Sequence, residues 1–317
     1  MAGASIRLLL GKLTGMSDLK ATQIEQIRHA LASSSLDFIL QKIGDHWTIS
    51  IILQAFLGVQ QFDLFHHNLG IPRQTLSVRL KQLLELGVLQ REANRYRLSS
   101  MGRGLYPLVL MCHAWENRWG ASGQMLPATI AHGQHNLQAR LVCRHCRQPA
   151  DVTTVLPQYV PGCTAPEWPG RRARRGIANG SDAQARVVMV GIVANRWSML
   201  LMTAICLGCH RNHELAQVLG LGSKLLADRL KSLCELGLLQ KRADLVDARR
   251  FVYTATPAGR DLFAFIVLIS QWCEKWLLKG QGSIRLMHLP CGQMLTPEVI
   301  CQQCQQTAVL AEGEMKF

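Results

Sequence analysis

Several features that would place this chain in other classes of protein are missing. No stretch approaches the ~20 consecutive apolar residues of a membrane span, and the early segment SIRLLLGKLTG is too short and interrupted for a signal-peptide core. Acidic residues are scarce, because 21 Asp and Glu stand against 35 Lys and Arg, which gives a formal net charge of +14 at pH 7. We therefore expect a cytoplasmic protein, without a membrane partner, that binds a polyanion such as nucleic acid.

Common catalytic motifs are absent as well. The sequence contains no GxSxG, no GxxxxGKS/T, no HExxH, and no GxGxxG that opens a helix after a strand. The few carboxylates mostly neighbour a basic residue, which leaves no evident pair for acid–base catalysis. The 11 cysteines are an odd number in a long chain, a pattern that favours reduced thiols or metal ligands over a secreted disulfide framework. We expect no enzymatic activity.

What the chain does contain is an internal repeat. Residues 43–91 superpose on 193–241 at a constant offset of 150 positions, so that VRLKQLLELGVLQ (78–90) returns as DRLKSLCELGLLQ (228–240). Past this block the offset becomes 157, which aligns two tryptophans of each copy. Chance similarity would not keep a constant offset over such a length, so we expect two homologous domains in tandem.

Each copy is predicted to form three helices, a hairpin and a further helix. In the first copy, helical periodicity covers 37–55, a short helix follows near 62–68, and a third covers about 72–86 and ends at Gly87. The hairpin follows at 91–102 and is seven residues longer in the second copy. Two short helices joined by a glycine-containing turn and followed by a hairpin are typical of a winged helix-turn-helix.

The predicted fold class is mainly α with small β wings, in two winged helix-turn-helix domains that each carry a small Cys/His appendage. The predicted boundaries are an extension (1–30), the first domain (31–130), its appendage (131–150), a Pro/Gly/Arg-rich linker (151–185), the second domain (186–285), and a second appendage with a tail (286–317). The extension is a candidate to add a helix to a homodimer interface.

The segments LQKIGDHWTISIIL, GIPRQTLSVRLKQLLELGVLQR and YRLSSMGRGLYPLVLMCHAWENRW resemble, in this order, the HxlR-type winged helix-turn-helix family of bacterial transcriptional regulators, which is related in fold to the MarR group. The second copy, with VANRWSMLLMTAI and LGSKLLADRLKSLCELGLLQKR, looks like the same domain after divergence. Members of this family are usually homodimers of single domains on pseudo-palindromic operators, and some respond to oxidants through cysteines. The resemblance implies a fused pseudo-dimer that binds a double-stranded DNA operator and responds to a signal or to redox state.

The candidate DNA contacts lie on the third helix and the hairpin of each copy. Arg73 and Gln74 stand at the helix start, where a recognition helix meets base edges, and arginines of the wings suit phosphates. The candidates are Arg73, Gln74, Thr75, Ser77, Arg79, Lys81, Arg91, Arg95 and Arg97 in the first copy, and Ser223, Lys224, Arg229, Lys231, Arg249 and Arg250 in the second. Arg79 and Arg229 have two open interpretations, a phosphate contact or a bridge from helix to wing.

The second copy departs from this pattern in ways that matter for DNA binding. Gly222 and Leu225 replace Pro72 and Thr75, and Asp228 adds a charge that repels phosphate. The helix-turn-helix of the second copy, called the second head below, is therefore expected to bind DNA more weakly, to have a different sequence specificity or to be mainly architectural. The alternative function is a protein-interaction or dimerisation module that keeps the winged-helix fold without reading DNA.

Each copy ends in paired cysteines and histidines. The first carries His132, His135, Cys143 and Cys146, and the second His288, Cys291, Cys301 and Cys304. Pairs separated by two residues reach one ion from a tight turn, and two such pairs complete a tetrahedral zinc site. Three interpretations stay open: one structural zinc within each copy, buried cysteines in a small strand-turn-strand appendage, or a thiol switch.

Overall fold

In the computed structural model, which describes residues 19–120, 129–163, 188–244 and 250–310, the chain divides into two compact units of three segments each. Unit 1 comprises Met1–Ile39, Leu141–Gly170 and Arg196–Pro297, and unit 2 comprises Leu40–Arg140, Arg171–Asn195 and Glu298–Phe317. Each unit therefore takes its helix-turn-helix from one copy of the repeat and further segments from the other copy.

Unit 2 contains the first helix-turn-helix. Its elements are α4 (His46–Phe56), α5 (Phe62–Leu69), α6 (Arg73–Leu86), β1 (Leu89–Glu92), β2 (Arg95–Leu98), α7 (Ser100–Arg103), α8 (Tyr106–Trp119), β3 (Ala131–His132), β4 (His135–Asn136) and α9 (Val188–Val193). Helix α9 comes from the second copy and packs on α4 and α8 of the first. Its Met189 N–H donates a hydrogen bond to the buried carboxylate of Glu116.

Unit 1 contains the second helix-turn-helix. Its elements are α2 (Ala21–Ala32), β6 (Val155–Tyr159), α10 (Arg196–Cys206), α11 (Asn212–Leu219), α12 (Ser223–Glu235), β7 (Leu239–Ala243), β8 (Phe251–Ala255), α13 (Pro257–Asp261), α14 (Phe263–Trp276), β9 (Ile284–His288) and β10 (Gln293–Met294). Three further elements cross from one unit's segments to the other's, namely α3 (Ser35–Ile43), β5 (Ala139–Cys143) and β11 (Pro297–Cys301).

The repeated phrase forms the buried face of the second helix in each helix-turn-helix. In α6 the buried side chains are Leu76, Leu80, Leu83 and Leu86, at helical spacing, and in α12 they are Leu226, Leu230 and Leu233. Gly87 ends α6 with φ of 84°, a left-handed conformation that glycine adopts without strain. The predicted helix and its glycine C-cap are confirmed.

The hairpins are confirmed as antiparallel wings. In unit 2, β1 pairs with β2 from Leu89↔Leu98 to Glu92↔Arg95. In unit 1, β7 pairs with β8 from Leu239↔Ala255 to Ala243↔Phe251. The longer tip of the second wing, residues 245–249, lies outside the described residues.

The prediction of one continuous helix over 37–55 is wrong, because α3 ends at Ile43 and α4 begins at His46. Asp45 is extended, with φ of −121° and ψ of 150°, and its carboxylate accepts the Thr48 N–H at 3.2 Å. An aspartate N-cap starts a new helix in this way, since it satisfies an N–H that has no partner within the helix. The periodicity of the apolar residues continued across this break and concealed it.

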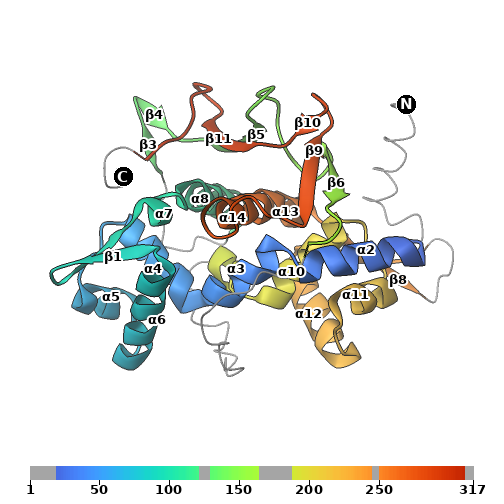
Figure 1. Cartoon of the computed structure of the whole chain (residues 1–317), viewed down its shortest axis with the longest axis horizontal. Helices are drawn as coiled ribbons and strands as arrows, with labels where there is room; N and C mark the ends of the chain where they lie inside the picture. The colour runs from blue at the N-terminus through green and yellow to red at the C-terminus, as the bar shows by residue number, and fades with distance from the viewer. Residues whose placement is uncertain (1–18, 121–128, 164–187, 245–249, 311–317) are drawn as a thin grey trace. The chain divides into compact units, whose positions relative to one another are not determined.

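Two segments outside the predicted domains are part of unit 1. Helix α2, in the predicted extension, packs against α10, α11 and β6 and buries Ile24, Ile27 and Leu31, so this apolar face is covered within the chain (Figure 1). Strand β6, in the predicted linker, pairs with β9 from Val155↔His288 to Tyr159↔Ile284. The start of the linker is therefore a strand, and residues 164–187 lie outside the described part of the chain.

The apolar faces of these helices and strands form the core of each unit.

Among the described helices, none combines the length and the hydrophobicity that crossing a bilayer requires.

Candidate nucleic-acid interface and cysteine/histidine clusters

The exposed face of α6 begins at its N-terminus. Arg73, Gln74, Ser77 and Lys81 are exposed and Thr75 is half-buried. The Arg73 guanidinium lies 2.8 Å from the Asp63 carboxylate and 5.6 Å above the Phe62 ring, both on α5. Because both partners of this ion pair are well exposed, the pair contributes little to stability, and the guanidinium remains available to a polyanion.

The wing of unit 2 carries three exposed arginines. Arg97 pairs with Glu92 across the hairpin at 3.0 Å, and Arg91 donates to the Ala93 carbonyl at 3.2 Å. Arg95 opens β2 directly after the turn. The wing therefore presents cations at its tip and along both strands.

Arg79 is half-buried and contacts residues of its own domain. Its side chain is 23% exposed, its Nε lies 3.3 Å from the Asp45 Oδ1, and its Nη1 donates to Gln82 at 2.9 Å. The Nε–H is not aimed at the carboxylate, so this contact is an ion pair without a hydrogen bond. Arg79 thus joins α6 to the N-cap of α4, a bridge within the domain that does not involve the wing.

The second head, in unit 1, presents a different face. Ser223, Lys224, Asp228 and Lys231 are exposed on α12, and the Lys231 Nζ lies 3.8 Å from Glu235. Arg229 is half-buried, like Arg79, and its Nε is buried without a hydrogen-bond partner among the described residues. The position that matches Asp45 in the second copy holds Asn195.

The described part of the second wing also carries three exposed cations, namely Lys241, Arg242 and Arg250. Lys241 lies 3.8 Å above the Phe251 ring, where a cation is attracted to the aromatic face. Arg250 is exposed directly before β8, whereas Arg249 lies outside the described residues.

A buried ionic network anchors this second wing. The Arg211 Nε donates to the Asp244 Oδ2 at 2.7 Å, and both side chains are 4% exposed. The Glu214 carboxylate accepts the backbone N–H groups of His210 and Arg211 at 2.8 and 2.9 Å. Sequence reasoning missed this network because Asp244 looked like one more polar residue of a loop. The one sequence feature that hinted at the network was HRNHE (210–214), which places charged residues directly after an apolar helix.

The structure gathers the eight cysteine and histidine residues into two clusters. His132, His135, Cys301 and Cys304 form one in unit 2, and Cys143, Cys146, His288 and Cys291 form the other in unit 1. In each cluster the ligand atoms lie within 4.8 Å of one another. This corrects the expectation that each copy supplies a complete set of four, because each cluster takes one pair from each copy.

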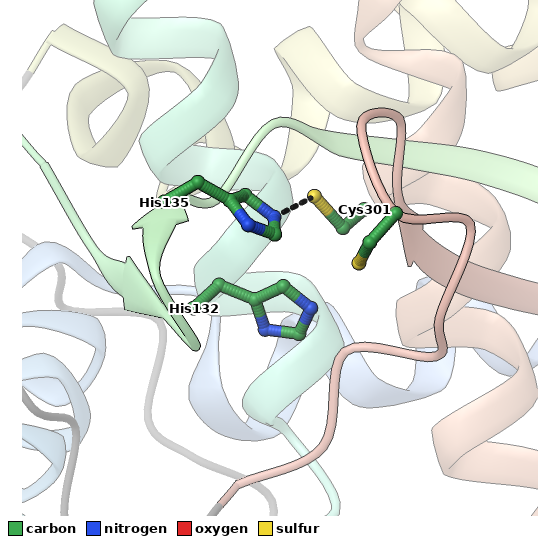
Figure 2. Close-up of side chains that lie close together, drawn as sticks. His132, His135 and Cys301 are labelled. Atoms are coloured by element: carbon green, nitrogen blue, oxygen red, sulfur yellow. Dashed lines mark hydrogen bonds between the residues drawn. The ribbon is translucent and has the colours of Figure 1, made fainter.

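The unit 2 cluster joins the β3–β4 hairpin to the turn after β11. His132 and His135 are directly paired across the hairpin, and their ring centroids are 5.2 Å apart. Figure 2 shows the His135 ring directed at Cys301, with Nε2 3.2 Å from the sulfur. Burial raises the pKa of Cys301, but N–H groups of Gln138, Cys304 and Gln303 and the His135 ring bring it down to about 6. This environment stabilises a thiolate.

The unit 1 cluster centres on His288, which is fully buried. Its Nδ1 lies 3.4 Å from the sulfurs of both Cys146 and Cys291, and its Nε2 lies 3.0 Å from the Pro149 carbonyl oxygen. The Cys143 and Cys291 sulfurs are 4.0 Å apart. Burial raises the pKa of Cys143, yet N–H donors from the turn and from Thr296 outweigh it, so the net shift is downward.

Unit 1 also encloses a cavity of about 360 Å³ between α14, the β6–β9 pair and the α2–α3 corner. Its lining is mostly apolar, with Glu274 as an acidic group and Arg285 as a basic one. Glu274 accepts a hydrogen bond from the Ser35 hydroxyl at 2.9 Å, and burial raises its pKa. Such a lining suits a small, largely apolar molecule.

The fold and its exposed faces define the class of protein. In each unit a helix and a turn precede a second helix with a buried stripe and a polar outer face, and a β hairpin follows, which is a winged helix-turn-helix. Residues 42–124 and 192–281 each match the model of the HxlR-like helix-turn-helix family. The chain belongs to this family, with two copies of its domain.

Curated relatives are about half as long as this chain. An uncharacterized HTH-type transcriptional regulator of Mycobacterium tuberculosis (strain CDC 1551 / Oshkosh) is 33% identical over 152 residues, which cover 45% of this chain and 96% of the relative. One of Mycobacterium bovis is 32% identical over the same length. The uncharacterized HTH-type regulator YtfH of Escherichia coli (strain K12) is 30% identical over 83 residues, 26% of this chain and 66% of the relative. No solved structure matches the chain.

Proposed function

We propose that this protein is a transcriptional regulator whose two fused winged helix-turn-helix domains act as a pseudo-dimer on one DNA operator. The observation that carries the proposal is the exposed N-terminal end of α6, where Arg73 and Gln74 stand on a helix braced from behind by a leucine stripe. Arginine and glutamine side chains are able to form bidentate contacts with base edges in the major groove. Membership of a helix-turn-helix family and the net charge of +14 support the same conclusion.

The first head has the more complete set of contacts. In this proposal Arg73 and Gln74 read bases, and Thr75, Ser77 and Lys81 contact bases or the adjacent backbone. Arg91, Arg95 and Arg97 of the wing bind phosphates. We assign Arg79 to bracing α6, because its partner is the Asp45 carboxylate.

The second head is proposed to bind more weakly or to read a different half-site. Ser223, Lys224 and Lys231 offer shorter or less specific contacts than Arg73 and Gln74, and Asp228 repels phosphate. Arg249 and Arg250 belong to its wing. Arg229 has the inward position of Arg79, so we assign it to the scaffold as well.

Footprinting of genomic fragments selected by the full-length protein tests this proposal. Two protected half-sites, one or two helical turns apart on one face, are expected if both heads bind in cis. A single protected half-site at saturation would contradict the pseudo-dimer. Salt dependence of binding to random duplex DNA tests the alternative, because several phosphate contacts give a slope of about −0.9 per contact. Absence of binding at low salt would favour a protein-interaction module.

Response to a signal is also part of the proposal. The thiols of the two clusters provide groups that an oxidant can modify, and the cavity of unit 1 provides space for a small molecule. Operator affinity measured before and after mild oxidation, and again after dithiothreitol, tests the redox form. A reversible change in affinity is expected, and an unchanged affinity would contradict it.

A further inference from the structure

We propose that the chain binds two structural zinc ions, one in each unit, and that each ion takes one pair of ligands from each copy of the repeat. The ion in unit 2 is held by His132, His135, Cys301 and Cys304, and the ion in unit 1 by Cys143, Cys146, His288 and Cys291. The donor sets are two nitrogens with two sulfurs, and one nitrogen with three sulfurs. Both sets are typical of tetrahedral zinc.

The separations between ligand atoms fit a tetrahedral ion. Zinc–sulfur bonds of about 2.3 Å and zinc–nitrogen bonds of about 2.0–2.1 Å place neighbouring nitrogen and sulfur ligands roughly 3.5 Å apart, and two sulfurs roughly 3.8 Å apart. The His135–Cys301 separation is 3.2 Å, and both sulfur–nitrogen distances at His288 are 3.4 Å. The Cys143 and Cys291 sulfurs are 4.0 Å apart. Little movement is needed for an ion to fit.

The nitrogens of both clusters are oriented for a metal. The Nε2 of His288 faces a carbonyl oxygen, which only accepts hydrogen bonds, so Nε2 carries the proton and Nδ1 presents a lone pair to the sulfurs. In unit 2, the Nε2 of His132 is buried and has no hydrogen-bond partner among the described residues. A buried ring nitrogen without a partner is costly, and a metal ion in the cluster would supply that partner.

Each set supplies four protein ligands, which leaves no open position for a substrate. The proposed ions are therefore structural, and their effect is on the fold. The pairs they join are far apart in sequence, since His135 and Cys301 are separated by 166 positions and Cys146 and His288 by 142. Each ion would hold a segment from one copy in the unit built around the other copy, and its binding free energy would add to folding.

Metal analysis of the untagged full-length protein is the first test. About two zinc ions per chain are expected, and a chelator should lower the midpoint of thermal unfolding. Fewer than about 0.2 zinc per chain, with unfolding unchanged in chelator, would overturn the proposal. Loss of two hydrogen atoms per Cys pair when such metal-free protein is mildly oxidised would show that the sulfurs form disulfides without any metal, and would overturn the proposal as well.

The grouping of ligands needs its own test, because pairing within each copy would give the same two donor sets. Cobalt substitution distinguishes the two groupings in the double variant Cys143→Ser/Cys146→Ser. The exchanged grouping leaves one site with two thiolates, from Cys301 and Cys304, whereas grouping within copies leaves one site with three. Thiolate-to-cobalt charge-transfer absorption reports this number, and a spectrum of three thiolates would overturn the exchange. Cys163→Ser, outside both clusters, is the matched control and should keep two ions.

A milder variant covers the case in which the double variant does not fold. Cys304→His keeps four ligands at every site. With exchanged pairs it produces one cobalt site with one thiolate and another with three, so two different spectra add. With pairs taken within copies, both sites would have two thiolates and one spectrum would result. That single spectrum would overturn the exchanged grouping.

Discussion

Comparison of α6 with α12 shows which positions of a winged helix-turn-helix are constrained and which are free to vary. From Leu76 to Leu83 and from Leu226 to Leu233 the side chains follow the same order of buried and exposed positions. The outer faces differ, with Arg73 and Gln74 in one head and Ser223 and Lys224 in the other. Packing against the domain core fixes the first set, whereas the second set faces solvent and is free to vary.

The wings differ in how they are attached. In unit 1, Asp244 at the end of β7 binds Arg211 in a buried ion pair, and Tyr253 donates its N–H to the His210 carbonyl at 2.8 Å. In unit 2 the matching N–H of Tyr96 also bonds to a carbonyl, that of Gln60, but the positions matching Arg211 and Glu214 hold Gln61 and Leu64. The longer wing is held by buried charges and the shorter wing by backbone bonds and packing.

The largest predicted effect comes from breaking the anchor of the longer wing. Asp244→Ala leaves Arg211 buried with one carboxylate fewer, and unit 1 should lose about 3–5 kcal/mol of stability, as is usual when one partner of a buried ion pair is removed. Denaturant unfolding measures this loss. Glu92→Ala, which removes an exposed partner of Arg97 in the other wing, is the matched control and should cost less than ~1 kcal/mol. Equal losses would contradict the contrast between the wings.

Removing the Arg73 side chain from the first head should weaken DNA binding selectively. Arg73→Ala is expected to lower operator affinity by about 1–3 kcal/mol while leaving random DNA nearly unaffected, because a base contact is lost. Arg95→Ala should weaken both alike and reduce the salt slope by about one contact. Gel-shift titrations at several salt concentrations measure these effects. If Arg73→Ala reduced binding to both DNAs equally, Arg73 would not read bases.

Removing the acidic residue from the second head should bring it closer to the first. Asp228→Val installs the residue found at the matching position, Val78, and removes a charge that repels phosphate. Affinity for duplex DNA should rise about two- to fivefold at low salt, an effect of up to ~1 kcal/mol that fades as salt is added. Glu25→Ala, which removes an exposed carboxylate of α2 outside both helix-turn-helices, is the control and should leave the affinity nearly unchanged. A decrease in affinity would show that Asp228 makes a favourable contact.

The smallest predicted effect concerns Glu274, whose counterpart in the first copy is Asn117. Burial raises the pKa of Glu274 above that of the unfolded chain. The neutral form is therefore favoured on folding, and this stabilisation is full below the unfolded pKa and is lost as pH rises through the folded pKa. The Glu274→Gln variant should lack this pH dependence. Its stability relative to the unmodified protein should therefore be greater at neutral pH than at acidic pH, by less than ~1 kcal/mol. Unfolding at pH 4 and pH 8 measures it, and an unchanged pH profile would contradict it.

Local patterns in the sequence were enough to predict the repeated scaffold. Helical periodicity located α6, Gly87 located its end, and a hairpin was expected at 91–102, the range that contains β2. These features depend on neighbours along the chain, which is why a pattern could identify them. The break before α4 was missed because an aspartate cap competed with an uninterrupted apolar periodicity.

Features that depend on distant residues could not be read in the same way. Spacing identified each Cys/His pair but carried no information on which pairs meet, and the structure joins them across copies. The partner of Arg79, an Asp45 that also caps α4, depends on how two helices pack. Strand β6 lies in a segment rich in proline, and its pairing partner β9 is about 130 positions away.

The exchange of segments between copies also determines the order in which the two units can be completed during synthesis. His132 and His135 leave the ribosome with the first helix-turn-helix, but Cys301, the sulfur nearest His135, follows 166 residues later. At about 5–20 residues per second, the first cluster waits roughly 8 to 33 seconds for its second pair of ligands. The helix-turn-helix encoded first therefore completes its unit last, and the nascent chain carries two histidines and two cysteines without their partners until the end of the second copy is made.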